Sequence, residues 1–128
     1  MSAGGKRVLL AALLLALAAG LFRPALENGF VYDDRVYMLA EKRLAAGLSQ
    51  EGVRWALGNA DLALYAPVTR LSILLDRQLF GASPRGYHLT NLALHAANAA
   101  LLFATLAAAT GALWRSAAVA ALFAVHPL

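Results

Sequence analysis

The feature that most constrains this chain is an uncharged apolar run of 23 residues, Tyr87–Ala109. An α-helix rises about 1.5 Å per residue, so about 20 apolar residues cross the hydrocarbon core of a bilayer. Tyr87 stands at one end of the run, and tyrosine is enriched at membrane–water interfaces. The run therefore predicts a membrane-spanning helix.

The composition agrees with this prediction. Hydrophobic residues make up 61% of the 128 residues and charged residues only 14%, whereas about 25% charged residues is usual in a soluble domain. The isoelectric point is near 10.0, but all seven acidic and eight of the eleven basic residues lie between Arg23 and Arg85. No basic face is left to follow a phosphate backbone, so we expect no nucleic-acid partner. The absence of cysteine excludes disulfides and zinc–thiolate sites.

A second apolar run, Val8–Phe22, follows Lys6 and Arg7 and can be extended to Leu26. The extended run is long enough to span a membrane if the side chain of Arg23 reaches the interface. The same pattern fits a cleaved secretory signal peptide, with Ala16-Leu17-Ala18 as the cleavage site. These residues alone leave both interpretations open.

A third apolar run, Trp114–Leu128, follows the tight turn Thr110-Gly111-Ala112. Its uncharged part is too short to cross a bilayer, so we expect this helix to continue beyond Leu128 in a longer protein. Lys6, Arg7 and Arg115 flank the runs, and the positive-inside rule assigns them to the cytoplasmic side. The loop between the first two spans then faces the periplasm or a lumen.

These assignments divide the chain into four parts. Residues 1–26 are a cytoplasmic tail and the first span, 27–86 an external loop, 87–109 the second span, and 110–128 a turn with the start of a third span. In the loop, Ser49 can cap a helix ending near Leu57, and Pro67 can open a helix ending at Phe80. We expect both helices to be amphipathic and interfacial, with Ser83–Gly86 as a turn into the second span; packing without any function is the alternative.

Two adjacent acids, Asp33 and Asp34, follow the first span and are flanked by Tyr32 and Arg35. Inverting glycosyl transfer needs a carboxylate that deprotonates the acceptor hydroxyl, and a neighbouring acid raises the pKa of such a base. The alternative is an Asx-type turn or a helix cap.

A polar stripe of four residues at helical spacing lies on the second span: His88, Asn91, His95 and Asn98. Such a stripe can line a substrate cavity, or it can supply interhelical hydrogen bonds. His88 and His95 are two turns apart, about 10.5 Å along the axis, so we expect no shared metal ion.

Arginines of the loop can hold an anionic leaving group, and Arg70 lies at a helix start, where backbone N–H groups also favour anions. The others in this set are Arg35, Arg77 and Arg85. Solvated arginines at the interface are the alternative. His126, at the end of the third run, is a further candidate.

Several motifs occur together in one order: Asn28–Asp34, Gly52–Ala56, Leu71–Gly81, Gly86–Asn98, Thr110–Ala117 and His126–Leu128. In this order they resemble the N-terminal membrane region of bacterial tetratricopeptide-repeat (TPR) membrane proteins related to the transmembrane-and-TPR O-mannosyltransferases, of the GT-C glycosyltransferase class. Many relatives carry an arginine where this chain has Ala66, which leaves Arg70 as the replacement cation.

The resemblance implies an all-α integral membrane protein, the N-terminal fragment of a GT-C-like multi-span helical bundle, with a retained first span and a C-terminal TPR domain. It implies a glycosyltransferase that moves a sugar from a polyprenyl-phosphate donor to a protein or glycan hydroxyl outside a bacterial inner membrane. We expect the membrane lipid, the lipid-linked sugar and a protein acceptor as partners, and leave any divalent metal open. The candidate catalytic residues are Asp33 and Asp34, and the candidate substrate-binding residues are Arg70, His88, Asn91, His95, Tyr32, Arg35 and His126. A non-catalytic membrane anchor for a TPR scaffold, and a small membrane protein complete in itself, are the alternatives.

Overall fold

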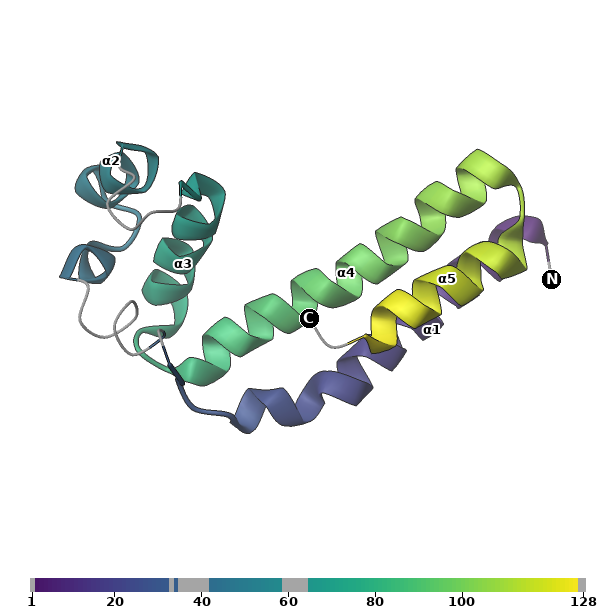
Figure 1. The fold of residues 1–128 in the computed structure, drawn as a ribbon, viewed down its shortest axis with the longest axis horizontal. Helices are drawn as coiled ribbons and strands as arrows, with labels where there is room; N and C mark the ends of the chain where they lie inside the picture. The colour runs from purple at the N-terminus through teal and green to yellow at the C-terminus, as the bar shows by residue number, and fades with distance from the viewer. Residues whose placement is uncertain (1, 33, 35–41, 59–64, 127–128) are drawn as a thin grey trace. The chain divides into compact units, whose positions relative to one another are not determined.

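A computed structural model describes residues 2–32, 34, 42–58 and 65–126 of the chain, and every element within them is helical (Figure 1). The elements are α1 (Ala3–Phe22), η1 (Arg23–Glu27), η3 (Lys42–Ala46), α2 (Gln50–Gly58), α3 (Pro67–Phe80), α4 (Pro84–Thr110) and α5 (Leu113–Val125). For these residues the predicted all-α class is confirmed. The chain forms two compact units, a bundle unit (Met1–Leu26 with Leu89–Leu128) and a loop unit (Glu27–His88).

Helix α1 begins earlier than the apolar run that predicted it. The hydroxyl oxygen of Ser2 accepts a hydrogen bond of 3.2 Å from the backbone N–H of Gly5, so Ser2 caps the helix and brings Lys6 into it. At the other end the chain continues as the 3-10 helix η1, which contains Pro24. Together α1 and η1 give one apolar stretch of 25 residues that is long enough to cross a membrane.

Helix α4 is a second stretch of sufficient length, with 27 residues. It begins at Pro84, so the predicted turn Ser83–Gly86 is wrong for three of its four residues. The physical reason is that proline fits the first position of a helix, where its missing N–H has no partner to lose. Gly111, with φ of 67°, then reverses the chain into α5, which is apolar but only 13 residues long within the described part of the chain.

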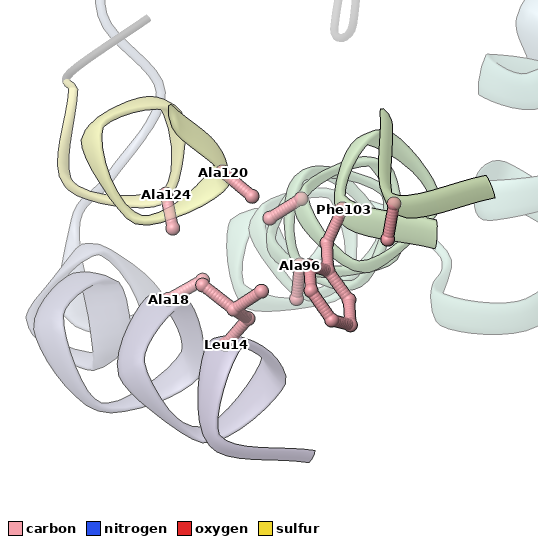
Figure 2. Close-up of a cluster of buried hydrophobic side chains, with 8 residues drawn as sticks. Leu14, Ala18, Ala96, Phe103, Ala120 and Ala124 are labelled. Carbon is pink, nitrogen blue, oxygen red and sulfur yellow. The ribbon is translucent and has the colours of Figure 1, made fainter. Parts of the chain in front are cut away.

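The core of the bundle unit is built largely from alanine. Figure 2 shows side chains of α1, α4 and α5 pointing toward a common centre, with Phe103 the one large ring among them. Phe103 is 1% exposed. The buried set is Leu14, Ala18, Ala96, Ala99, Phe103, Ala107, Ala120 and Ala124. Small side chains let helix backbones approach closely, which is how helices associate in a bilayer, where burial from water supplies no driving force.

The loop unit has its own small core. Leu44 of η3, Ala56 of α2 and Leu74 of α3 are buried together, with Trp55 packed against them. Helices α2 and α3 begin and end within about one residue of the predicted bounds, whereas η3 was not predicted. Ser49 accepts a 3.1 Å hydrogen bond from the N–H of Gly52 at the start of α2, and Pro67 opens α3.

Helix α3 was predicted to be amphipathic, and only part of its apolar face is buried. Leu74 is fully buried and Leu71 packs against the same cluster. Leu75 and Leu79 are 43% and 62% exposed, because α2 and η3 cover only one side of this face. The structure thus leaves an apolar face on α3, as an interfacial helix would need.

Replacing Gly52 with alanine is expected to destabilise the loop unit by about 1–3 kcal/mol, the usual cost of overpacking. An added Cβ at this position would overlap the backbone carbonyl oxygen of Gly47, and a backbone atom cannot move aside as a flexible side chain can. Gly58→Ala, in the same helix, is the matched control because its Cβ would meet nothing within 4 Å. Limited trypsin digestion at increasing temperature compares the two; equal midpoints would contradict the prediction.

Candidate functional site

The acidic motif forms a closed turn in the loop unit. The backbone N–H of Val31 donates to Oδ2 of Asp34 at 3.2 Å, and the N–H of Asp34 donates to the Val31 carbonyl at 3.0 Å. The Asp34 carboxylate therefore helps to close the turn by accepting from a residue three positions earlier, the direction found in a helix-capping box and not in an Asx turn. Asp33 and Arg35 lie outside the described residues.

Tyr32 sits at the tip of this turn in an unusual conformation. Its φ of 50° places it in the left-handed region, which residues other than glycine rarely adopt. Its side chain is 95% exposed. The two hydrogen bonds between Val31 and Asp34 close the turn around this residue, so the ring of Tyr32 is exposed at the turn that carries the Asp34 carboxylate.

The segment before the turn is anchored on the corner between α3 and α4. The ring of Phe30 packs edge-on against Tyr87, with 5.4 Å between ring centroids. Tyr87 is 5% exposed, and its hydroxyl donates to the carbonyl of Gly81 at 2.9 Å. This contact fixes where the chain enters the acidic turn.

Arg70 is positioned differently from a free anion-binding cation. It lies in the first turn and a half of α3, but its side chain is 7% exposed. The guanidinium stacks over the ring of Trp55 on α2, with 5.2 Å to the ring centroid, and it has a further interaction partner. Arg70 therefore ties α3 to α2, while Arg85 at the start of α4 is exposed.

Asp76 and Arg77 are adjacent on α3, and the sequence did not predict that their side chains are buried or half-buried. Asp76 is 5% exposed and has an interaction partner, and Nη1 of Arg77 is buried without a hydrogen bond. Both lie close enough to the Tyr87 hydroxyl to act on it electrostatically. The only sequence signal was an Asp-Arg pair that interrupts an apolar stripe, and charged residues on such a helix usually face solvent.

The predicted polar stripe of α4 separates into two environments. His95 is buried and His88 half-buried, while Asn91 and Asn98 are exposed. Seven residues bring a helix back to within about 20° of the same direction, so the two histidines share a face. Three residues leave a side chain about 60° off at 3.6 residues per turn, which turns both asparagines away from that face.

His95 joins two helices of the bundle unit. Its Nε2 lies 3.2 Å from the carbonyl oxygen of Ala124 near the end of α5. A carbonyl can only accept, so Nε2 carries the proton in this contact. The ring packs between Phe22 and Phe123, with centroids at 5.3 and 5.1 Å. This is the interhelical hydrogen bond that the sequence left open as an alternative. His126 is exposed and ends α5 through its own N–H.

Replacing His95 with leucine is expected to lower the stability of the bundle unit by about 0.6 kcal/mol, the average worth of an interhelical hydrogen bond in a membrane protein. Leucine retains most of the packing between Phe22 and Phe123 but leaves the Ala124 carbonyl without its partner. Asn91→Leu is the control, because Asn91 is exposed on the same helix. Thermal unfolding in detergent micelles measures both; a larger loss from Asn91→Leu would contradict this role for His95.

Within the described ranges, the structure brings together no group of three His, Cys, Asp or Glu side chains that could hold a metal ion. The features of the loop unit are instead the Asp34 carboxylate at a turn, the exposed ring of Tyr32 in the same turn, and two buried charged side chains on α3, Arg70 and Asp76. A carboxylate of this kind can accept a proton from a hydroxyl that approaches the turn.

Two curated proteins are similar to this chain. One is Protein O-mannosyl-transferase Tmtc2 of Drosophila melanogaster, 32% identical over 121 residues, which cover 88% of this chain and 13% of the relative. The other is Protein O-mannosyl-transferase Tmtc1 of the same species, 35% identical over 120 residues, covering 88% of this chain and 14% of the relative. The chain is related to these transferases.

The chain spans about one seventh of the length of these relatives. The match to these relatives leaves about one eighth of this chain unaligned. The stretch before Val31 is longer than that, so the aligned part includes the acidic turn. No family model and no solved structure matches the chain. Its two long apolar helices and its membrane-associated relatives together indicate a membrane protein.

Proposed function

We propose that this chain is the part of a GT-C-type membrane glycosyltransferase that carries the catalytic acidic turn. In this proposal the enzyme moves a sugar from a polyprenyl-phosphate donor to a hydroxyl of a protein or glycan, on the external face of the membrane. The observation that carries the proposal is the similarity to two O-mannosyl-transferases over 88% of the chain, which includes the turn at residues 31–34. A repeat domain elsewhere in the protein and a bacterial inner membrane with residues 27–86 in the periplasm belong to the same proposal.

The chemistry assigned to the turn is that of a general base. The acceptor oxygen attacks the anomeric carbon of the sugar, its proton passes to an aspartate carboxylate, and the bond from that carbon to the donor phosphate breaks. The phosphate leaves with the electron pair of that bond. Asp34 or its neighbour Asp33 takes the proton, and Tyr32, exposed at the same turn, is placed to pack against the sugar ring or the acceptor.

The leaving phosphate needs a cation. Arg70 is committed to Trp55, whereas Arg77 has a buried nitrogen without a hydrogen bond and Arg85 is exposed on the first turn of α4. Guanidinium groups bind phosphate through two parallel hydrogen bonds. In our proposal Arg77 and Arg85, both in the loop unit, are therefore the candidates for this contact, ahead of Arg70. His88, Asn91 and His126 stay proposed substrate-binding residues.

A direct test uses the natural full-length protein in proteoliposomes with radiolabelled polyprenyl-phosphate mannose and a serine- and threonine-rich peptide. Transfer of label to the peptide is expected with the protein and not with empty liposomes. The donor should also be replaced by polyprenyl-phosphate glucose, because the proposal does not name the sugar. No transfer from either donor, by protein that binds neither, would overturn the proposal.

A scaffold function is the second candidate, and two observations favour it. The Asp34 carboxylate already holds its own turn, and Arg70 is stacked on Trp55 instead of facing an open site. Both are explained if the loop unit is only a folded platform. Co-purification of a lipid-linked sugar with the protein would count against the scaffold.

A further inference from the structure

An apolar groove runs along the bundle unit where α1 and α5 lie side by side. It has a volume of about 380 Å³ and is lined by four leucines of α1, between Leu10 and Leu17, and by Trp114 with three alanines of α5. Every lining residue is apolar. This groove is separate from the acidic turn, which lies in the loop unit.

The two helices that form the groove run in the same direction. Figure 1 shows the N-terminal end of α1 beside the turn that joins α4 to α5, so both helices start at the same end of the bundle unit. The lining residues follow this arrangement, since they span 10–17 on α1 and 114–121 on α5. The groove therefore has one end at the helix starts, where Trp114 stands.

Three exposed cations gather at that end: Lys6, Arg7 and Arg115. Lys6 is four residues before Leu10, so it lies on the groove face of α1, about one turn beyond the apolar lining. Arg115 follows Trp114 directly. No acidic residue occurs anywhere in Met1–Leu26 or Leu89–Leu128, so nothing in this unit offsets the positive charge.

We infer that the groove binds one anionic phospholipid from the leaflet at the Lys6 end, with an acyl chain between α1 and α5 and its phosphate at Lys6 and Arg115. The charge at one end and the wholly apolar lining match the two halves of such a lipid. Basic pockets between spanning helices recognise anionic headgroups in this way, and a tryptophan suits the level where headgroup and acyl chain meet. The inference goes beyond the proposed transfer reaction and does not depend on it.

The experiment uses the natural full-length protein in nanodiscs of phosphatidylglycerol and phosphatidylcholine in equal amounts. Native mass spectrometry of the released protein counts the lipids of each kind that stay bound. Wild type is expected to retain phosphatidylglycerol preferentially. Lys6→Gln and Arg115→Gln are each expected to reduce that preference about fivefold, the contribution of one cation near anionic lipid.

Two controls make the test specific. Arg23→Gln removes an exposed cation from the opposite end of α1 and is expected to leave the preference unchanged. Ala118→Leu places a larger side chain in the groove and is expected to remove the bound lipid, whereas Ala104→Leu, on an exposed position of α4, is expected to keep it.

Three results would overturn the inference. One is equal retention of the two lipids by wild type. Another is the same loss from Arg23→Gln as from Lys6→Gln and Arg115→Gln. The third is an unchanged lipid count in Ala118→Leu, which would mean that a helix or a second copy of the chain, and not a lipid, fills the groove.

Discussion

Asp34→Asn in the natural full-length protein is expected to lower sugar transfer by at least about 100-fold, the lower end of what a general base contributes. Asparagine keeps an oxygen that can accept the hydrogen bond from Val31, so the turn is retained while the charge and the basicity are lost. Asp33→Asn is expected to have an effect of similar size if the two carboxylates act as base and partner. Initial rates with labelled donor in proteoliposomes measure both variants.

The comparison with alanine separates chemistry from structure at this turn. Asp34→Ala removes both the charge and the hydrogen bond that holds Tyr32 in its left-handed conformation. If Asp34 only holds the turn, Asp34→Asn should transfer sugar normally and Asp34→Ala should not. Glu51→Gln, which neutralises an exposed acid of α2 in the same unit, is the charge control. Normal transfer in both Asp33→Asn and Asp34→Asn would eliminate the catalytic assignment.

The second large effect is expected at a buried charge. Asp76→Ala should destabilise the loop unit by about 1–3 kcal/mol, because Asp76 is 5% exposed and takes part in an interaction that the substitution would remove. Arg54→Ala, an exposed position on α2, should change stability by less than about 0.5 kcal/mol.

Protease protection of the loop unit measures both substitutions as a function of denaturant. If Asp76→Ala is no more sensitive than Arg54→Ala, the carboxylate contributes nothing to the fold. In that case its burial on α3 has to be explained by function, and the transfer assay becomes the deciding measurement for this residue.

The helices were predictable because their signals are local. Ser49 caps α2 and Pro67 opens α3, and each makes its contact within one turn of its own position. A local error, at Ser83–Gly86, came from treating Pro84 as a turn residue when it is the first residue of α4. Proline is common both in turns and at the first position of a helix. The residues around Pro84 do not distinguish these two positions; the start of α4 does.

The burial and contacts of the candidate site residues were less predictable, because they depend on which other helices pack against them. The spacing placed the four polar side chains along α4, but only His95 meets neighbouring helices, through Phe22 and through Phe123 and Ala124 of α5. The burial of Arg70 depends on Trp55, 15 positions earlier in the chain. The left-handed φ of Tyr32 goes together with the two hydrogen bonds between Val31 and Asp34. The sequence does not show whether an aspartate at this position makes these bonds.

The alanine packing of α1 against α4 and α5 has a thermodynamic consequence. The heat capacity that proteins gain on unfolding comes from hydration of apolar surface. Inside a bilayer, helices that separate expose their alanine methyl groups to acyl chains and not to water, so little of that heat capacity is gained. When the loop unit unfolds, the cluster of Leu44, Ala56 and Leu74 becomes exposed to water, and the heat capacity rises accordingly. On cooling, the apolar stabilisation of that cluster therefore weakens, while the contacts among the bundle helices keep their strength.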